Sequence, residues 1–132
     1  MKVTIILSIF ALLIVTLGAC SNAPAGESAP TMIVISSTDL KAMAKEKENL
    51  TIVDVRQASD FGEGHIEGAT NIPYQLAIDT IAKEYSKTDK IILVCYRGVS
   101  SKRVASSLVG KEFTNIYNLK GGMDGWDGEL TK

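Results

Sequence analysis

The sequence is poor in several chemically informative residue types, and it has no excess of charge of one sign. Its 132 residues contain 14 basic and 15 acidic side chains, which leave a net charge of −1. A balanced charge with a pI near 5.8 provides no basic footprint for nucleic acid, so we expect no nucleic-acid partner. The length suits one domain rather than two.

Long hydrophobic runs are scarce, and the longest one lies at the N-terminus. Lys2 precedes an apolar run over residues 3–17, which is the anatomy of a secretory signal peptide. The tetrapeptide LGAC at 17–20 follows and resembles the lipobox of bacterial lipoproteins. The resemblance implies a signal peptide over 1–19, cleavage before Cys20, a diacylglycerol on its sulfur and a further acyl chain such as palmitate. The alternative is an uncleaved anchor, since the run nearly reaches the ~17 residues of short membrane-spanning helices.

Both interpretations hold the chain at a membrane in the cell envelope, facing the periplasmic or extracellular side. Several acyl chains on Cys20 would make that attachment stable. Residues 20–31 comprise this cysteine and the segment SNAPAGESAPT, which is rich in small residues and proline and is typical of a flexible tether. We therefore expect the folded domain over residues 32–132.

Cysteine and histidine are the scarcest reactive residues. If Cys20 carries lipid, Cys95 is the one free thiol, and no disulfide can form within the chain. One histidine and one free cysteine do not make a zinc ligand set, so we expect no metal site. A single thiol in an oxidising compartment indicates either chemistry at sulfur or deep burial.

Short strand-like runs alternate with helical patterns after residue 32. The expected strands are 32–35, 51–55, 69–72, 91–95 and 115–119, and the expected helices are near 40–44, 76–85 and 100–109, with a short helix or irregular turn at 58–64. Strands without alternating polarity favour a parallel sheet that is covered on both faces. The sequence therefore predicts an α/β fold.

The segment CYRGVSS, residues 95–101, joins the run IILV to a helical pattern. Backbone N–H groups in such a loop, backed by a helix N-terminus, favour negative charge and promote ionisation of a thiol. The alternative is a buried cysteine that ends a core strand. Ligands of open parallel sheets bind at the carboxyl ends of strands, which favours a nucleophile at Cys95. We expect its pKa to be lowered.

Three motifs in this order are similar to those of a single rhodanese domain: DVRQASDFGEGHIEGATNIP at 54–73, CYRGVSS at 95–101 and GGMDGW at 121–126. The resemblance implies a five-stranded parallel sheet flanked by helices on both faces. It also implies a sulfurtransferase that works without a cofactor. Cys95 would take sulfane sulfur from a small sulfur-containing anion such as thiosulfate, carry it as a persulfide and pass it to a thiol or cyanide.

The resemblance also implies which residues form the site. The substrate-binding loop would consist of Tyr96, Arg97, Gly98, Val99, Ser100 and Ser101. The N–H groups of residues 96–100 would surround the terminal sulfur, and Gly98 would permit the tight turn.

Other motif residues would support that site. Asp54 either orients the loop by hydrogen bonding or caps its strand, and Arg56 is expected to pair with Asp60. His65 belongs to the structural part of the motif, whereas a cysteine protease would need it as a base. The glycines Gly121 and Gly122 would let a second loop approach the pocket.

One position departs from the pattern of many active rhodaneses, which carry arginine where this chain has Ser100. Arg97, Lys102 and Arg103 are nearby positive charges that would partly replace it. The departure leaves open a non-catalytic carrier or binding module for sulfane sulfur. A phosphatase or arsenate reductase is disfavoured, because those reactions need arginine at the position of Ser101.

Overall fold

A computed structural model describes residues 29–46 and 49–132 of the chain. The signal peptide, Cys20 and most of the tether expected from the sequence lie outside the described residues. The elements are β1 (Ile33–Ile35), α1 (Ser37–Lys45), β2 (Leu50–Asp54), α2 (Ala58–Glu63), β3 (Ala69–Asn71), α3 (Tyr74–Glu84), β4 (Lys90–Val94), α4 (Val99–Gly110), β5 (Ile116–Leu119) and the 3₁₀ helix η1 (Gly122–Gly125).

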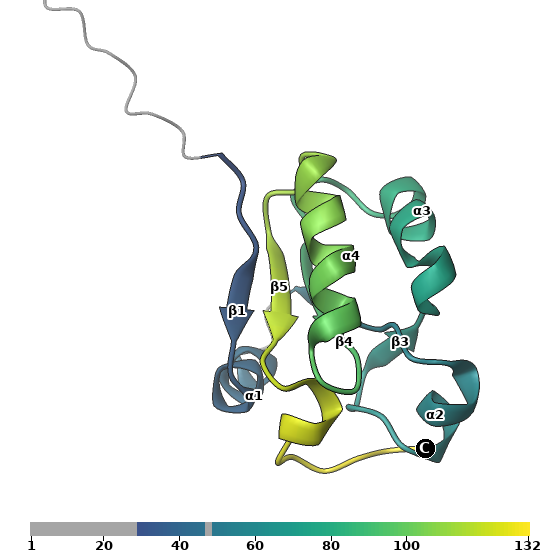
Figure 1. The fold of residues 1–132 in the computed structure, drawn as a ribbon. Helices are drawn as coiled ribbons and strands as arrows, with labels where there is room; N and C mark the ends of the chain where they lie inside the picture. Colours follow the sequence, from purple (N-terminus) through teal and green to yellow (C-terminus); the bar gives the residue numbers. More distant parts are fainter. Residues whose placement is uncertain (1–28, 47–48) are drawn as a thin grey trace, which may run out of the picture.

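The five strands form one parallel sheet in the order β1-β5-β4-β2-β3 (Figure 1). The expected α/β class and five-stranded parallel sheet are confirmed. Successive residues of β4 point to opposite faces, because side chains alternate along a strand. Ile91 and Leu93 enter one hydrophobic cluster, whereas Ile92 and Val94 enter another. This explains why β4 is apolar throughout and shows no alternation in the sequence.

Helices cover both faces of the sheet. The cluster that contains Leu93 includes Ala77 and Ile81 of α3 and Leu108 of α4. The opposite cluster includes Leu40 of α1 and receives Trp126, which follows η1. Trp126 therefore packs against the core, as its apolar ring suggests.

Helix boundaries follow local chemistry. Ser36 caps α1 in a capping box, in which its hydroxyl accepts from the Asp39 N–H at 3.1 Å and the Asp39 carboxylate accepts from the Ser36 N–H at 2.8 Å. Helix α4 starts at Val99, one residue before the expected pattern. Gly98 precedes it in a left-handed conformation with φ of 81°, which glycine adopts without strain.

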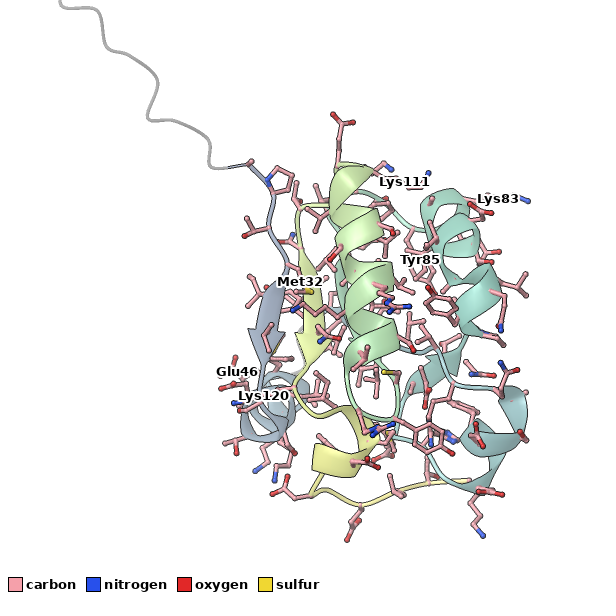
Figure 2. The ribbon with its side chains drawn as sticks, in the orientation of Figure 1. Met32, Glu46, Lys83, Tyr85, Lys111 and Lys120 are labelled. Carbon is pink, nitrogen blue, oxygen red and sulfur yellow. The ribbon has the colours of Figure 1, made fainter. Side chains whose placement is uncertain are left out.

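The carboxyl ends of the strands meet at one edge of the sheet, where the loop between β4 and α4 lies beside η1 (Figure 1). Lys83 and Lys111 extend from the opposite edge (Figure 2). Within residues 29–46 and 49–132, no helix has the length and apolar character needed to cross a membrane. The site expected from the sequence therefore lies at the edge where parallel sheets bind ligands.

Candidate active site

Cys95 lies between the last residue of β4 and the loop that leads to α4. The residue is 6% exposed. Its Sγ accepts a hydrogen bond from the Gly98 N–H, with an N–S distance of 3.1 Å, and a second from the hydroxyl of the buried Ser101, with an O–S distance of 3.2 Å. The sulfur thus accepts from two donors, an arrangement that favours a thiolate.

These donors lower the pKa of the Cys95 thiol. Burial alone would raise it, since burial disfavours the charged form. The Ser101 hydroxyl and the backbone N–H groups of Ser101, Arg97 and Gly98 oppose burial, and the pKa falls below its ordinary value. The direction is the one expected from the sequence. At neutral pH a larger fraction of Cys95 is the nucleophilic thiolate.

The 3₁₀ helix η1 binds the first two carbonyls of the loop that begins at Cys95 and so orients the peptides of that loop. The Met123 N–H donates to the Cys95 carbonyl at 2.8 Å, and the Asp124 N–H donates to the Tyr96 carbonyl at 2.9 Å. In a trans peptide the carbonyl and the N–H lie on opposite sides. Binding both carbonyls on the η1 side therefore directs the N–H groups of Tyr96 and Arg97 away from η1.

Gly122 allows this close approach. Its φ is 57°, and a Cβ at this position would lie 2.1 Å from the Cys95 carbonyl oxygen and 2.6 Å from that of Tyr96. No side chain fits there without moving the loop. Gly121, with φ of 75°, makes the turn out of β5 that leads into η1.

A pocket of about 550 Å³ opens onto Cys95. Its lining comprises Val55, Arg56, Gln57, Asp60, Tyr74, Gln75, Cys95, Tyr96, Arg97, Val99 and Ser100. Of the three positive charges expected near the site, Arg97 lines this pocket, and Lys102 and Arg103 do not. Asp60 faces the same pocket, and a hydrogen bond to its carboxylate raises the pKa of Tyr96. The pocket therefore offers one solvent-exposed cation and one acid.

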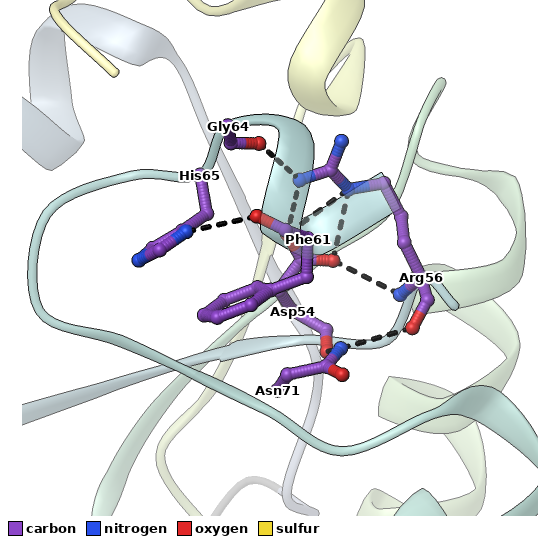
Figure 3. A network of polar contacts seen from close by, with 6 residues as sticks. All are labelled: Asp54, Arg56, Phe61, Gly64, His65 and Asn71. Atoms are coloured by element: carbon purple, nitrogen blue, oxygen red, sulfur yellow. Dashed lines mark hydrogen bonds and ion pairs between the residues drawn. The ribbon is translucent and has the colours of Figure 1, made fainter. Parts of the chain in front are cut away.

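Arg56 and Asp54 form a buried ion pair beside the pocket (Figure 3). The Arg56 guanidinium donates to both carboxylate oxygens of Asp54, at 2.7 to 3.1 Å, and to the Gly64 carbonyl at 2.8 Å. The expected pairing of Arg56 with Asp60 is wrong, because Arg56 pairs with Asp54 instead. The Asp54 carboxylate also accepts from the Arg56 backbone N–H at 2.9 Å, which holds the two side chains together.

The ion pair contacts the cysteine loop at the aromatic ring of Tyr96. The Arg56 guanidinium carbon lies 5.3 Å from the centroid of the Tyr96 ring, which is within the range of a cation–π interaction. Asp54 itself hydrogen bonds to Arg56 and not to the loop. Its influence on the residue after Cys95 is therefore indirect, and the pair forms one wall of the site.

His65 occupies a structural position. Its ring stacks on that of Phe61, with centroids 3.7 Å apart, and its Nδ1 lies 2.9 Å from the Phe61 carbonyl oxygen (Figure 3). Its backbone pairs with Thr131. His65 is absent from the pocket lining, so it is not positioned as a base for Cys95. In the described part of the chain, His, Cys, Asp and Glu side chains form no group of three that is suited to a metal ion.

The sequence did not reveal several pocket residues. Gln57 and Gln75 face the pocket together, with their side-chain amides 3.5 Å apart, and Tyr74 lines it from the first turn of α3. These residues precede or begin helices after β2 and β3, as expected for ligand-binding segments at strand ends. The rule that ligands bind at the carboxyl ends of parallel strands could have identified them. Gln57 follows β2 and Tyr74 and Gln75 follow β3, each after a short loop.

The chain is similar in sequence to known proteins. A family model described as a rhodanese-like domain matches residues 36–129. Thiosulfate sulfurtransferase GlpE of Pseudomonas entomophila is 35% identical over 86 residues, covering 65% of this chain and 78% of that protein. The protein of the same name from Actinobacillus pleuropneumoniae serotype 3 is 35% identical over 85 residues, covering 62% of this chain and 75% of that protein.

Solved structures show the same fold. A rhodanese-like domain protein from Staphylococcus aureus is 31% identical, with a TM-score of 0.69, and the match covers 76% of this chain and 97% of that one. A rhodanese from E. coli, solved with anions, is 26% identical, with a TM-score of 0.57 and coverage of 63% of this chain and 98% of that one.

Replacing Ser101 with alanine is expected to raise the pKa of Cys95 by about one unit, because the thiolate loses one charge-assisted hydrogen bond. The measurement is the rate of iodoacetamide alkylation against pH, read by mass spectrometry on the peptide that contains Cys95. Ser106→Ala, which changes an exposed serine of the same helix, is the control and should leave the midpoint unchanged. A wild-type midpoint near the unperturbed ~8.5 would contradict the assignment.

Proposed function

Since the chain belongs to the rhodanese-like domain family, we propose that it is a sulfurtransferase that carries sulfane sulfur as a persulfide on Cys95. The observation that supports this proposal is the pair of donors on Sγ, the Gly98 N–H and the Ser101 hydroxyl. They stabilise the anionic thiolate of Cys95 in the lining of the pocket, and this thiolate is the nucleophile that would take up the sulfur. The relatives called thiosulfate sulfurtransferase suggest the class of donor.

The reaction takes place in two displacements at sulfur. In the first, the Cys95 thiolate attacks the outer sulfur of thiosulfate. A sulfur–sulfur bond forms on Cys95, the sulfur–sulfur bond of the donor breaks, and sulfite leaves with the bonding electron pair. In the second, a thiolate or cyanide attacks the terminal sulfur of the persulfide. This releases the product and regenerates the Cys95 thiolate, so each half-reaction balances without an external oxidant.

The site favours a small anion as donor, although its positive charge is modest. Arg97 and Ser100 are exposed residues of the pocket lining, which also includes Asp60. Arg56 faces the pocket too, but its charge is neutralised by Asp54. Arg97 is therefore the group best placed to attract the sulfonate end of thiosulfate, in the role that arginine at the position of Ser100 would have.

The second candidate is a carrier that loads sulfur and turns over poorly. The observation that favours it is the exposed hydroxyl of Ser100 where an arginine would clamp the anion. Loading and turnover are separate measurements, because a carrier forms the persulfide once and a sulfurtransferase regenerates its thiolate at a steady rate.

Incubation with thiosulfate, followed by removal of the excess, is expected to add the mass of one sulfur atom to the peptide that contains Cys95. Cyanide should remove the added mass and release thiocyanate. Cys95→Ala is the control and should gain nothing. If wild-type protein gains no sulfur from thiosulfate, from polysulfide or from a low-mass persulfide, the persulfide mechanism is wrong.

Arg97→Ala is expected to raise the KM for thiosulfate about tenfold, which corresponds to the loss of one ionic contact of about 1.4 kcal/mol. Turnover at saturating donor should change less. Arg103→Ala provides the matched control, because Arg103 is exposed on α4 and does not line the pocket. Equal KM values for Arg97→Ala and the wild type would remove Arg97 from the donor site.

We also propose that the protein is held at a membrane outside the cytoplasm by lipid on Cys20. The support is the sequence alone: an apolar run over 3–17, the tetrapeptide LGAC and a small-residue tether. The expected result is that the wild-type chain fractionates with membranes of the bacterial cell and incorporates a labelled fatty acid. Cys20→Ala should abolish the labelling. A labelled Cys20→Ala protein would exclude Cys20 as the lipid attachment site.

A further inference from the structure

Asn118 is a buried polar residue in the interior of the sheet. It lies on β5, between β1 and β4, and it is 4% exposed. The other buried polar or charged residues of the described segments are Asp54, Arg56 and Ser101, and all three belong to the site. Asn118 is the fourth, and its position in a central strand calls for a separate explanation.

The side chain of Asn118 is only half satisfied. Its Nδ2 donates to the Gly98 carbonyl, with an N–O distance of 3.2 Å. Its Oδ1 is buried and has no hydrogen-bond partner among the described residues. A buried acceptor without a partner is destabilising, and an apolar β-branched side chain suits a central strand better. The stability of the sheet therefore does not explain this amide.

Gly98, in contrast, is held from two sides. Its N–H donates to the Cys95 sulfur at 3.1 Å, and its carbonyl accepts from Asn118. A Cβ on Gly98 would lie 3.0 Å from the Leu119 carbonyl oxygen and 3.6 Å from the Asn118 Nδ2, so this glycine rests directly on the end of β5. The amide thus connects the sheet to the residue that donates to the reactive sulfur.

The contact with Asn118 complements those made by η1. The N–H groups of η1 hold the Cys95 and Tyr96 carbonyls, at the start of the loop. Asn118 holds the Gly98 carbonyl, at the end of the same loop. That carbonyl belongs to the peptide between Gly98 and Val99, whose N–H lies on the opposite side. The Lys102 N–H reaches the same carbonyl at 3.3 Å as the first turn of α4, so the carbonyl keeps a partner without Asn118.

We propose that Asn118 is a positioning residue for the reactive thiol: it holds the carbonyl of Gly98 and thereby fixes this residue, so that its N–H, in the preceding peptide, stays on the Cys95 sulfur. The Asn118 amide donates to Gly98 and not to the sulfur, and Asn118 does not line the pocket, so it acts through Gly98. The proposal concerns the site of the proposed function, but ionisation of Cys95 can be measured without sulfur transfer. The two can therefore fail separately.

The test is the pH profile of Cys95 alkylation in the full-length Asn118→Val protein, read on the peptide that contains Cys95. Valine removes the amide and suits a central strand. The midpoint is expected to rise by about half a unit to one unit, because the hydrogen bond from Gly98 to the thiolate weakens. The thermal unfolding midpoint should stay within a few degrees of the wild-type value, since the Gly98 carbonyl keeps its bond from Lys102.

The matched control is Ile116→Val, which removes a buried methylene at the start of the same strand, away from the loop. It should leave the alkylation midpoint unchanged. An unchanged midpoint in folded Asn118→Val, or an equal shift in Ile116→Val, would overturn the proposal. If Asn118→Val does not fold, Asn118→Ala removes the same amide and must show the same shift. A shift in a protein that never forms a persulfide would leave this proposal standing while the proposed function fails.

Discussion

The reactive cysteine depends on one geometric constraint: the carbonyls of its loop must point away from the sulfur so that N–H groups can point toward it. A planar trans peptide carries the two groups on opposite sides, so a donor that binds the carbonyl also aims the N–H. In this chain η1 binds the carbonyls of Cys95 and Tyr96, and the N–H that shares a peptide with the Tyr96 carbonyl, that of Arg97, is among the donors that lower the pKa of Cys95. Burial alone would raise the pKa of the Cys95 thiol, and these N–H groups lower it together with the Ser101 hydroxyl.

The parallel sheet supplies the rest of the arrangement. Its strands all end at one edge, so the loops after β2, β4 and β5 meet there although they are far apart in the sequence. The loop after β2 contributes the Arg56–Asp54 pair, whose guanidinium lies over the Tyr96 ring. A buried ion pair is weak support for stability, and here it forms a wall of the pocket beside the cysteine.

The residue at position 101 distinguishes this cysteine loop from that of phosphatases. Phosphatases with a cysteine loop need arginine at this position to clamp an oxyanion. Here a buried serine places a hydroxyl donor 3.2 Å from the sulfur itself. This neutral donor stabilises the charge on sulfur but provides no positive charge with which to clamp a phosphate. The residue thus suits chemistry at the thiolate and not at phosphorus.

The sequence by itself determined the fold class and the direction of the pKa shift of Cys95. Apolar strand runs without alternation indicated a two-sided parallel sheet, and Cys95 at the end of β4 indicated a reactive thiol. The positions of the strands were also predictable, within one or two residues of β1 to β5.

The tertiary structure alone decided how the loop is held. The partner of Arg56 proved to be Asp54 rather than Asp60. Of the two glycines expected to let a second loop approach, Gly122 is the one that lies against the Cys95 and Tyr96 carbonyls. The role of Asn118 gave no sequence signal, because a hydrogen bond across 20 residues depends on the register of β5 beside β4. Periodicity reports which face of an element is buried, but the contact of two distant backbones is set only when the sheet assembles.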